Sequence, residues 1–288
     1  MKYINFNDLI DTIRKNLYKV PRDIDFIIGV PRSGMIVASI ISEYINVPLI
    51  DINSFSHGEK PSGGNRLNLL EKKEYGKVLV VDDTCYSGAS MKNAKELLKN
   101  FNNYQFVYMC AYLEGSGESE VDIYLEDVRQ YTVGSEIQIV LYEWNLMNHY
   151  PFISQRCIYD IDGVMCVDPP DERNTDEYEK YIENALPLFL PKVKIGAIIT
   201  YRLEKYRQIT EKWLEKNGVK YDNLLMFNGL SWEERNNSGI SSSLMKGTIY
   251  KKSKGFVLFI ESDDKQAQEI FSISGKPVLS IEKNIVYQ

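Results

Sequence analysis

Short apolar runs alternate with segments of helical periodicity along the whole chain. This pattern is typical of α/β proteins with a mainly parallel sheet, because each buried strand is followed by a helix that covers the sheet. In the first half, the pattern predicts helices at 6–17, from the 31–35 turn to about 45, and at 91–99. It predicts strands at 25–30, 48–52, 77–81 and 105–112, and weaker ones at 121–128 and 137–142.

The alternation starts again after Pro151, and we therefore expect two domains, 1–150 and 151–288. The second half has predicted strands at 157–161, 193–199, 223–227, 256–260 and 277–281, of which the last closes the sheet. Helices are expected at 203–217 and 265–271. The predicted fold class is α/β, with two Rossmann-like three-layer domains.

Composition narrows the class of protein. A chain of 288 residues is long enough for two domains, and 44% hydrophobic with 26% charged residues is ordinary for a soluble protein. A net charge of -6 argues against specific nucleic-acid binding. The N-terminus lacks a signal-peptide core and no apolar run could span a membrane, so we expect a cytoplasmic protein. We expect reduced thiols at the four cysteines, Cys85, Cys110, Cys157 and Cys166.

One stretch combines an apolar strand with acidic and hydroxyl-bearing residues. The predicted strand 77–81 runs into Asp82 and Asp83, and residues 84–90 supply hydroxyls and a glycine before a helix begins. Loops at the ends of parallel strands face ligands, and helix N-termini favour anions. The loop therefore suits a phosphate monoester, while adjacent carboxylates suit a vicinal diol or Mg²⁺. A sugar phosphate with a free diol satisfies both.

This stretch resembles the signature of the phosphoribosyltransferase family. The resemblance implies that Asp82 and Asp83 grip the ribose hydroxyls of phosphoribosyl diphosphate, with Asp83 also counted as catalytic. It implies that the loop holds the 5-phosphate through Thr84, Ser87, Gly88, Ala89 and Ser90. An earlier turn matches the diphosphate loop of the family with Arg32, Ser33 and Gly34. The resemblance covers roughly residues 20–145.

Two further features bear on the phosphoribosyl transfer that this resemblance implies. The polar segment 54–76 matches the flexible loop of the family, where a basic residue assists the departure of diphosphate. Lys60 and Arg66 are the candidates, Arg66 is counted among the substrate-binding residues, and His57 ranks third. The hood that selects a nucleobase in this family is not recognisable in residues 1–24, which are expected to form one helix and a turn. The acceptor therefore stays open.

A second pair of carboxylates, Asp160 and Asp162, follows the strand predicted at 157–161. One intervening residue places both side chains on the same side of an extended chain. The sequence from Asp160 to Gly163 resembles motif one of the haloacid dehalogenase superfamily. The resemblance implies a Mg²⁺-dependent phosphatase in which Asp160 attacks phosphorus and Asp162 protonates the leaving oxygen and then activates water.

The remaining motifs of that superfamily follow in order. Thr200 stands at the end of a predicted strand as the phosphate-binding residue, and Arg202 adds a cation for the substrate. Lys246 is the expected lysine, with Lys251 as the second choice. The expected metal ligands are Asp160, Asp162, Glu261 and Asp263, and Asp264 is an alternative. The resemblance covers about residues 156–288 and implies a small cap.

The two motifs together suggest consecutive reactions. We expect a bifunctional enzyme that transfers 5-phosphoribose from phosphoribosyl diphosphate to a glycan hydroxyl, giving a β-linked ribofuranose, and then hydrolyses the 5-phosphate. One alternative is a nucleobase phosphoribosyltransferase fused to a nucleotidase. Another is a regulatory protein that senses phosphoribosyl diphosphate without turnover. The acceptor is a glycan or another small molecule, Mg²⁺ is the expected cofactor, and a homo-oligomer is compatible with the sequence.

Overall fold

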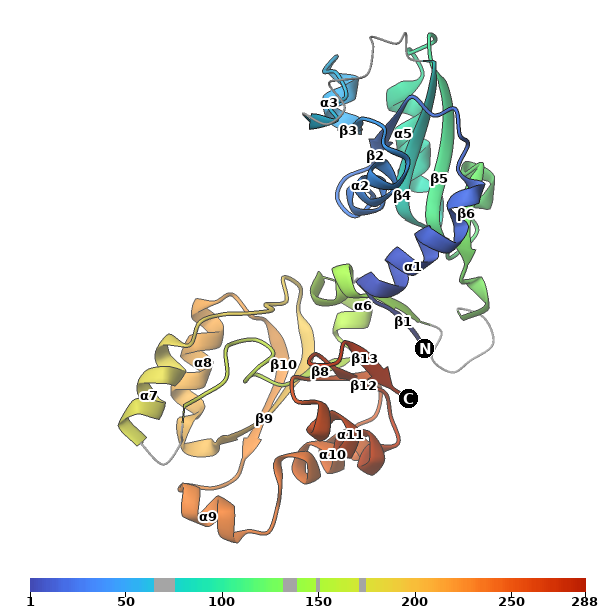
Figure 1. The fold of residues 1–288 in the computed structure, drawn as a ribbon. Helices are drawn as coiled ribbons and strands as arrows, with labels where there is room; N and C mark the ends of the chain where they lie inside the picture. The colour runs from blue at the N-terminus through green and yellow to red at the C-terminus, as the bar shows by residue number, and fades with distance from the viewer. Residues whose placement is uncertain (65–75, 132–138, 149–150, 171–174) are drawn as a thin grey trace. The chain divides into compact units, whose positions relative to one another are not determined.

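The computed structural model describes residues 1–64, 76–131, 139–148, 151–170 and 175–288 (Figure 1). It divides into two compact units, Met1–Trp144 and Asn145–Gln288. The sequence-based boundary at residue 150 lies a few residues further along the chain. The predicted α/β class with mainly parallel sheets is confirmed. Among the described residues, no helix has the length and apolar character needed to cross a bilayer.

The first unit contains a five-stranded parallel sheet with the order β3-β2-β4-β5-β6. Its strands are β2 (Phe26–Gly29), β3 (Leu49–Asp51), β4 (Lys77–Cys85), β5 (Gln105–Leu113) and β6 (Ile123–Asp127). A separate two-stranded sheet pairs β1 (Lys2–Ile4) with β7 (Val140–Tyr142) in parallel. The sequence pattern missed β1, because a three-residue strand is too short to show a period.

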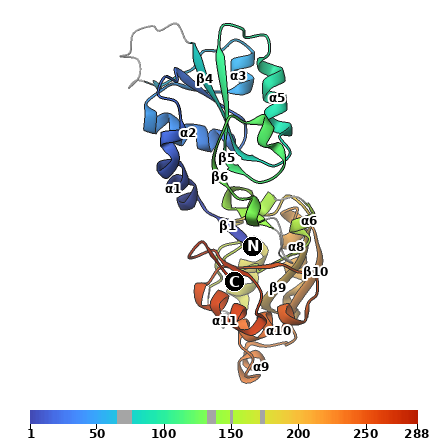
Figure 2. The same ribbon diagram turned by 90° about the vertical axis from the view of Figure 1, so that its right-hand side faces the viewer.

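Helices cover both faces of this five-stranded sheet (Figure 2). Strand β4 shows the layering: Leu79 and Val81 pack in one apolar cluster with helix residues such as Ile13 and Val37. Val78 and Val80 pack in another with Phe55, Ala94 and Leu98. The first face carries α1 (Phe6–Asn16) and α2 (Gly34–Ile45), and the second α3 (Ile52–Ser56) and α5 (Ala89–Leu98). Short 3-10 turns are η1 (Leu17–Lys19), η2 (Gly117–Glu120), η3 (Arg129–Tyr131) and η4 (Glu143–Asn148).

The second unit contains a six-stranded sheet with the order β10-β9-β8-β11-β12-β13. Its strands are β8 (Cys157–Tyr159), β9 (Ile195–Leu203), β10 (Tyr221–Phe227), β11 (Leu258–Glu261), β12 (Val278–Ser280) and β13 (Ile285–Tyr287). All neighbours are parallel except β12 and β13. The prediction that the strand at 277–281 closes the sheet is wrong, because the antiparallel β13 lies beyond it.

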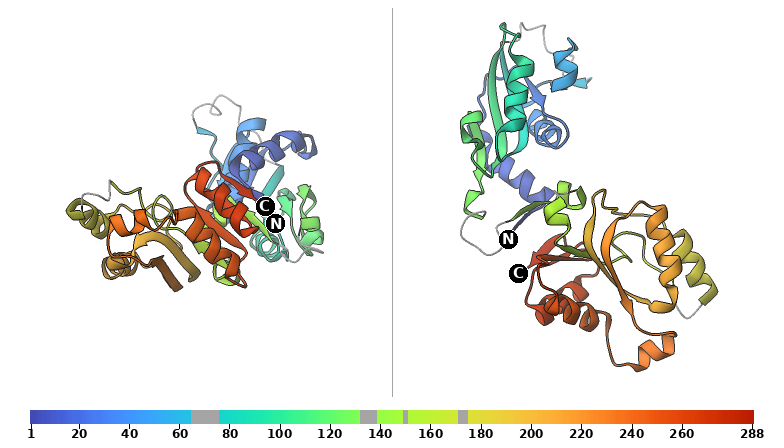
Figure 3. Two further views of the ribbon diagram at one scale, coloured as in Figure 1. Left: turned by 90° about the horizontal axis from the view of Figure 1, so that it is seen from below. Right: turned by 180° about the vertical axis from the view of Figure 1, so that it is seen from behind.

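Helices also cover both faces of the second sheet (Figures 1 and 3). One face carries α7 (Thr175–Asn184) and α8 (Arg207–Lys216). The 3-10 turn η5 (Glu204–Tyr206) directly precedes α8 in the chain. The other carries α10 (Ser242–Lys252) and α11 (Asp264–Ser274), which lie side by side. Two short helices complete the unit, α6 (Pro151–Ser154) and α9 (Trp232–Asn237). The expectations from sequence did not include α7, α9 or α10.

Candidate active sites

The acidic pair of the first unit lies inside a strand. β4 does not end at Val81 as predicted but continues to Cys85, because it stays paired with the long β5. Successive side chains of a strand point to opposite faces, so Asp82 and Asp83 have different surroundings. Both are nearly enclosed, with exposed fractions of 7% and 6%. Charges this buried need partners, and those partners define the site.

Gly34 brings the turn at 31–34 against the acidic pair. A Cβ atom at Gly34 would lie 2.7 Å from the Val81 carbonyl oxygen and 2.8 Å from the Asp82 Cα atom. Only a glycine permits this approach without displacing the backbone of β4. The peptide bond between Pro31 and Arg32 in the same turn is cis. The predicted diphosphate loop and the predicted ribose-binding carboxylates are thus adjacent.

Local hydrogen bonds hold Asp82. Its Oδ1 accepts the backbone N–H of Asp83 at 2.9 Å, and the Ser90 hydroxyl also bonds its carboxyl group. Burial, together with the neighbouring Asp83 charge, raises the pKa of Asp82 to about 7. Its burial and the adjacent charge therefore favour the neutral form of Asp82.

Asp83 accepts a hydrogen bond from an indole and lies near a half-buried carboxyl group. The Trp144 Nε1–H donates to Asp83 Oδ2 at 2.6 Å. The Tyr142 hydroxyl donates to Glu114 Oε2 at 3.4 Å. Burial raises the pKa of Glu114 to about 7, and the Asp83 charge contributes. Sequence reasoning missed Glu114 and Trp144, although Glu114 directly follows β5 and so shares the ligand-facing edge of the sheet.

The predicted phosphate loop leads into α5 as expected. Gly88 takes a left-handed φ of 77° and is the residue before the first turn of this helix. The Ala89 N–H points to the Ser87 hydroxyl at 3.4 Å. Ser87, Ala89 and Ser90 are exposed and Thr84 is half-buried. Backbone N–H groups at the start of this ten-residue helix are available to an anion.

The remaining residues predicted for the first site are His57, Lys60 and Arg66 of the polar segment 54–76. His57 is exposed, and its Nδ1 lies 2.7 Å from the Asn53 carbonyl oxygen. Lys60 is exposed, and Arg66 lies outside the described residues. A cavity of about 220 Å³ adjoins the 31–34 turn and α5. Its lining includes Pro31, Asn53 and Ser90.

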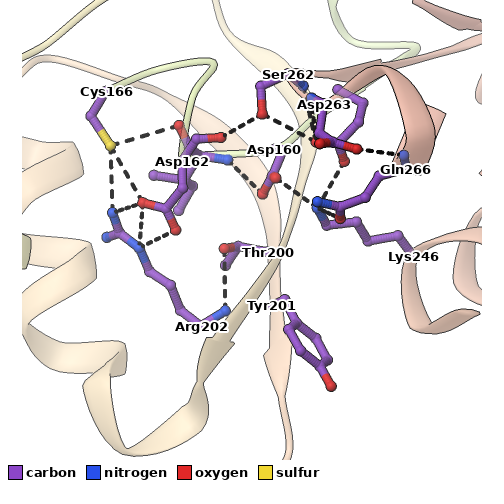
Figure 4. Close-up of polar contacts among 12 residues, drawn as sticks. Asp160, Asp162, Cys166, Thr200, Tyr201, Arg202, Lys246, Ser262, Asp263 and Gln266 are labelled. Carbon is purple, nitrogen blue, oxygen red and sulfur yellow. Dashed lines mark hydrogen bonds and ion pairs between the residues drawn. The ribbon is translucent and has the colours of Figure 1, made fainter. Parts of the chain in front are cut away.

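In the second unit, Lys246 joins the ends of two neighbouring strands (Figure 4). Its Nζ lies 2.6 Å from Asp160 Oδ2, just after β8, and 2.7 Å from Glu261 Oε2, the last residue of β11. A longer bond of 3.3 Å reaches Gln266 Oε1. The lysine predicted from the sequence is thus brought to the predicted nucleophile from α10, a helix that the sequence analysis missed.

The single positive charge of Lys246 faces two buried carboxyl groups, those of Asp160 and Glu261. One negative charge of this cluster is therefore not neutralised when both carboxyl groups are ionised. Burial, with the charges of Glu261 and Asp162, raises the pKa of Asp160 to about 7, although Lys246 acts against the rise. Burial would lower the pKa of Lys246, but the two carboxylates outweigh it and raise that pKa above its usual value. Lys246 is therefore a stable cation, and the excess charge rests on the carboxylates.

Asp162 is held by a different cation. Arg202 is only 1% exposed and places Nη2 at 2.5 Å from Asp162 Oδ1 and Nε at 3.0 Å from Oδ2. The Tyr181 hydroxyl of α7 donates to the same carboxylate at 2.7 Å, and the Cys166 thiol lies 3.6 Å from it. Although burial alone would raise it, Arg202 holds the pKa of Asp162 below its usual value. These contacts engage Arg202 with Asp162, and its expected role toward the substrate stays a prediction.

These groups line a cavity of about 630 Å³ (Figure 4). Thr200 is almost fully buried at its wall, and the Arg202 N–H points to its hydroxyl at 3.4 Å. Lys251 is not part of the lining. The lining includes Asp160, Asp162, Gly163, Asp168, Thr200, Arg202, Ser242, Lys246, Ser262, Asp263 and Glu282.

The cavity suits a divalent cation in part. Asp160 and Asp263 offer carboxylate oxygens to it, and the excess negative charge around Asp160 favours a cation. Glu261 is fully buried and bonded to Lys246 and the Ser262 N–H, outside the lining. Asp264 bonds the Tyr287 hydroxyl. Among the described residues, no three acidic, histidine or cysteine side chains form a ready metal cluster. The four-ligand set stays a prediction.

One family model matches the first unit. Residues 3–145 match the model of the phosphoribosyl transferase domain. The N-terminal unit is therefore a phosphoribosyltransferase domain, and the resemblance noted at Asp82 and Asp83 is confirmed for this part of the chain.

Two curated relatives carry the same name. The xanthine-guanine phosphoribosyltransferase of Idiomarina loihiensis is 28% identical over 128 residues, which cover 43% of this chain and 73% of the relative. That of Chromohalobacter salexigens is 29% identical over 114 residues, covering 38% and 66%.

Solved structures of similar proteins align with part of the chain. The Helicobacter pylori xanthine-guanine-hypoxanthine phosphoribosyltransferase aligns over 51% of this chain and 99% of its own, with 18% identity and a TM-score of 0.37. The Aeropyrum pernix orotate phosphoribosyltransferase covers 43% and 72%, with 19% identity and a TM-score of 0.33.

Proposed function

We propose that this chain catalyses two consecutive reactions. Its first unit transfers the 5-phosphoribosyl group of phosphoribosyl diphosphate to an acceptor, and its second unit hydrolyses the 5-phosphate of the product. The observation that carries the second half is the contact of Lys246 with Asp160 in the cavity that Thr200 also lines, with the buried Glu261 behind Lys246. The first half rests on the phosphoribosyltransferase domain with its buried acidic pair.

In the first reaction, Asp82 and Asp83 bind the two ribose hydroxyls and the start of α5 binds the 5-phosphate. The 31–34 turn, held against Asp82 by Gly34, binds the diphosphate. Glu114 is suited to accept the proton of the acceptor, because a base with a pKa of about 7 is half-ionised at neutral pH. The C1–diphosphate bond breaks, the bond from C1 to the acceptor forms, and diphosphate leaves.

A nucleobase is the first acceptor that we propose. The relatives matched over the first unit are named xanthine-guanine phosphoribosyltransferases. The indole of Trp144, bonded to Asp83, supplies an aromatic ring beside the ribose-binding carboxylates. Flat bases stack well on such rings. With a nucleobase, the second unit would act as a nucleotidase, and the overall product would be a nucleoside.

A glycan hydroxyl is the second acceptor. The observation in its favour is that the N-terminal residues pack within the first unit. β1 pairs with β7, and α1 packs against α2, β5 and β6. In the described part of residues 1–64, this leaves no separate N-terminal lobe over Asp82 and Asp83 to enclose a base. With this acceptor, the product would carry a β-linked ribofuranose.

In the second reaction, Asp160 is the nucleophile toward phosphorus, and water hydrolyses the aspartyl phosphate after giving a proton to Asp162. Arg202 keeps Asp162 ionised and therefore able to act as this base, whereas Asp162 has to take up a proton before it can protonate the leaving oxygen. Lys246 holds Asp160 in place, and Thr200 offers its hydroxyl to the phosphate. Arg202 and Tyr181 fix the orientation of Asp162. Mg²⁺, held by Asp160 and Asp263, would offset the repulsion between carboxylates and phosphate.

The test separates the two reactions in one protein. Purified enzyme is incubated with phosphoribosyl diphosphate and Mg²⁺, with guanine, xanthine or hypoxanthine in one set and oligosaccharide acceptors in another. Diphosphate and phosphate are measured separately. Asp160→Asn should release diphosphate but no phosphate, and its product should carry a 5-phosphate by mass spectrometry.

Each outcome has a distinct meaning. Diphosphate release only with oligosaccharides would replace the nucleobase by the glycan hydroxyl. Binding of phosphoribosyl diphosphate without release under any condition would favour a sensor and contradict the proposal. Loss of both reactions in Asp160→Asn would contradict independent sites.

A further inference from the structure

Both cations of the phosphatase cavity are already used by carboxylates. Lys246 is 2% exposed and bonded to Asp160 and Glu261, and Arg202 is 1% exposed and bonded to Asp162. They are the only cationic side chains in the described lining of the cavity. The cavity can therefore bind the phosphate group that reacts, but its lining offers no further cation to a second anionic group on the same substrate.

The accessible part of the cavity is acidic. Asp168 and Glu282 are exposed side chains in its lining, and Asp263 is a third. Asp168 lies close to Gly163, the residue after Asp162, because its Oδ1 would be 2.8 Å from a Cβ atom at Gly163. The Glu282 carboxylate accepts the Asp264 N–H at 3.1 Å. A second anion on a substrate would meet these like charges at short range.

One side chain of the lining suits an uncharged group instead. Ser242 lies one helical turn before Lys246 on α10, and its hydroxyl has no hydrogen-bond partner among the described residues. Because its Oγ atom is buried, the side chain would have to turn toward the cavity to bond a sugar hydroxyl, which can both donate and accept.

On the basis of the proposed function, we infer that this cavity accepts phosphomonoesters whose leaving group is uncharged, and that it rejects phosphoribosyl diphosphate. That compound carries the same 5-phosphate as the transfer product. It also carries a diphosphate on C1, whose negative charge a bound Mg²⁺ does not fully offset. Departure of this diphosphate in the first reaction removes the group that the cavity repels. The charge of the cavity thus keeps the phosphatase from destroying the donor of the first reaction.

The test compares phosphate release by the full-length protein from three compounds: ribose 5-phosphate, guanosine 5′-monophosphate and phosphoribosyl diphosphate. The acceptor is omitted, and free Mg²⁺ is kept constant. We expect kcat/KM for phosphoribosyl diphosphate to be lower by about tenfold or more than for the other two. The nucleotide controls for size, because it is bulky at C1 but carries no charge there. The difference should shrink with added salt, because screening weakens repulsion between exposed charges.

Charge variants connect the preference to named residues. Asp168→Asn and Glu282→Gln should each raise kcat/KM for phosphoribosyl diphosphate relative to ribose 5-phosphate by severalfold. Glu215→Gln removes an exposed carboxylate of α8 outside this cavity and should leave the ratio unchanged. Equal hydrolysis of all three compounds by the wild-type protein would overturn this inference but not the proposed phosphatase. No hydrolysis of any monoester would overturn both.

Discussion

The Trp144 indole N–H donates to Asp83 Oδ2 at 2.6 Å, linking the last residue of the first unit to the acidic pair of its central strand. The same indole packs against Tyr142 and Phe6, with ring centroids 5.1 Å and 5.5 Å away. The aromatic cluster therefore holds the donor in place. Asp83 is nearly enclosed, and this bond fixes which of its oxygens is left for a ligand.

Trp144→Phe should weaken the binding of phosphoribosyl diphosphate while keeping the aromatic packing. A hydrogen bond to a buried carboxylate contributes about 1.5–3 kcal/mol, so KM for this substrate should rise by roughly tenfold or more. Steady-state assays of diphosphate release measure it. Trp232→Phe, in α9 of the other unit, is the matched control and should not change KM. An unchanged KM in Trp144→Phe would mean that Asp83 is positioned without the indole.

Gly34→Ala tests the close approach of the 31–34 turn to β4. The added methyl group would lie within 3 Å of backbone atoms of Val81 and Asp82, which cannot move without disturbing the core strand. We expect a loss of about 1–3 kcal/mol in the free energy of unfolding and a large fall in diphosphate release. Gly76→Ala is the control, because its nearest atom beyond the chain neighbours is 3.7 Å away. Equal behaviour of the two variants in thermal unfolding and activity assays would contradict this account.

The sequence was sufficient to predict most core strands, because a buried parallel strand is a continuous apolar run. Residues 77–81 and 256–260 are examples. It was less informative where an element is defined by its partners. β1 is three residues long and exists because β7 lies beside it. Helix α10 has buried Ser243 and Lys246 where an amphipathic pattern would place apolar residues. Ser243 bonds Glu269 of α11, and Lys246 bonds Asp160 and Glu261.

For the second site, the motifs name residues that the structure places around one cavity, but they do not predict the contacts among these residues. Asp160, Thr200 and Lys246 line one cavity, as the motifs imply. The sequence could not show that Arg202 would bond Asp162, or that Glu261 would face Lys246 instead of the cavity. Pairing of buried charges depends on side-chain directions from strands far apart in the chain. Glu114 and Tyr181 were missed for the same reason.

Lys246→Met should destabilise the second unit and stop phosphate release. It leaves Asp160 and Glu261 buried without their shared cation, which costs about 3–5 kcal/mol. The double variant with Glu261→Gln removes one of the two stranded charges and should recover part of this stability. Neither variant should release phosphate, whereas both should still release diphosphate. Thermal unfolding and the two product assays check this. Phosphate release by the double variant would show that Lys246 serves only the fold.

The raised pKa of Asp82 predicts how stability depends on pH. The unfolded carboxyl group titrates near its usual value of 3.8, and in the folded protein its pKa is about 7. Between these values the folded state binds more protons at this position. The contribution of Asp82 to folding stability is therefore greatest at low pH and is lost as the pH rises toward 7.

Asp82→Asn removes this contribution, because the amide has nearly the same shape and does not titrate. The slope of unfolding free energy against pH between 4 and 7 should become less negative by at most about 1.4 kcal/mol per pH unit. Urea unfolding of both proteins at pH 5 and pH 7 measures the change. The variant should gain stability over the wild type at pH 7 relative to pH 5. Parallel pH profiles would instead show that Asp82 is ionised throughout this range.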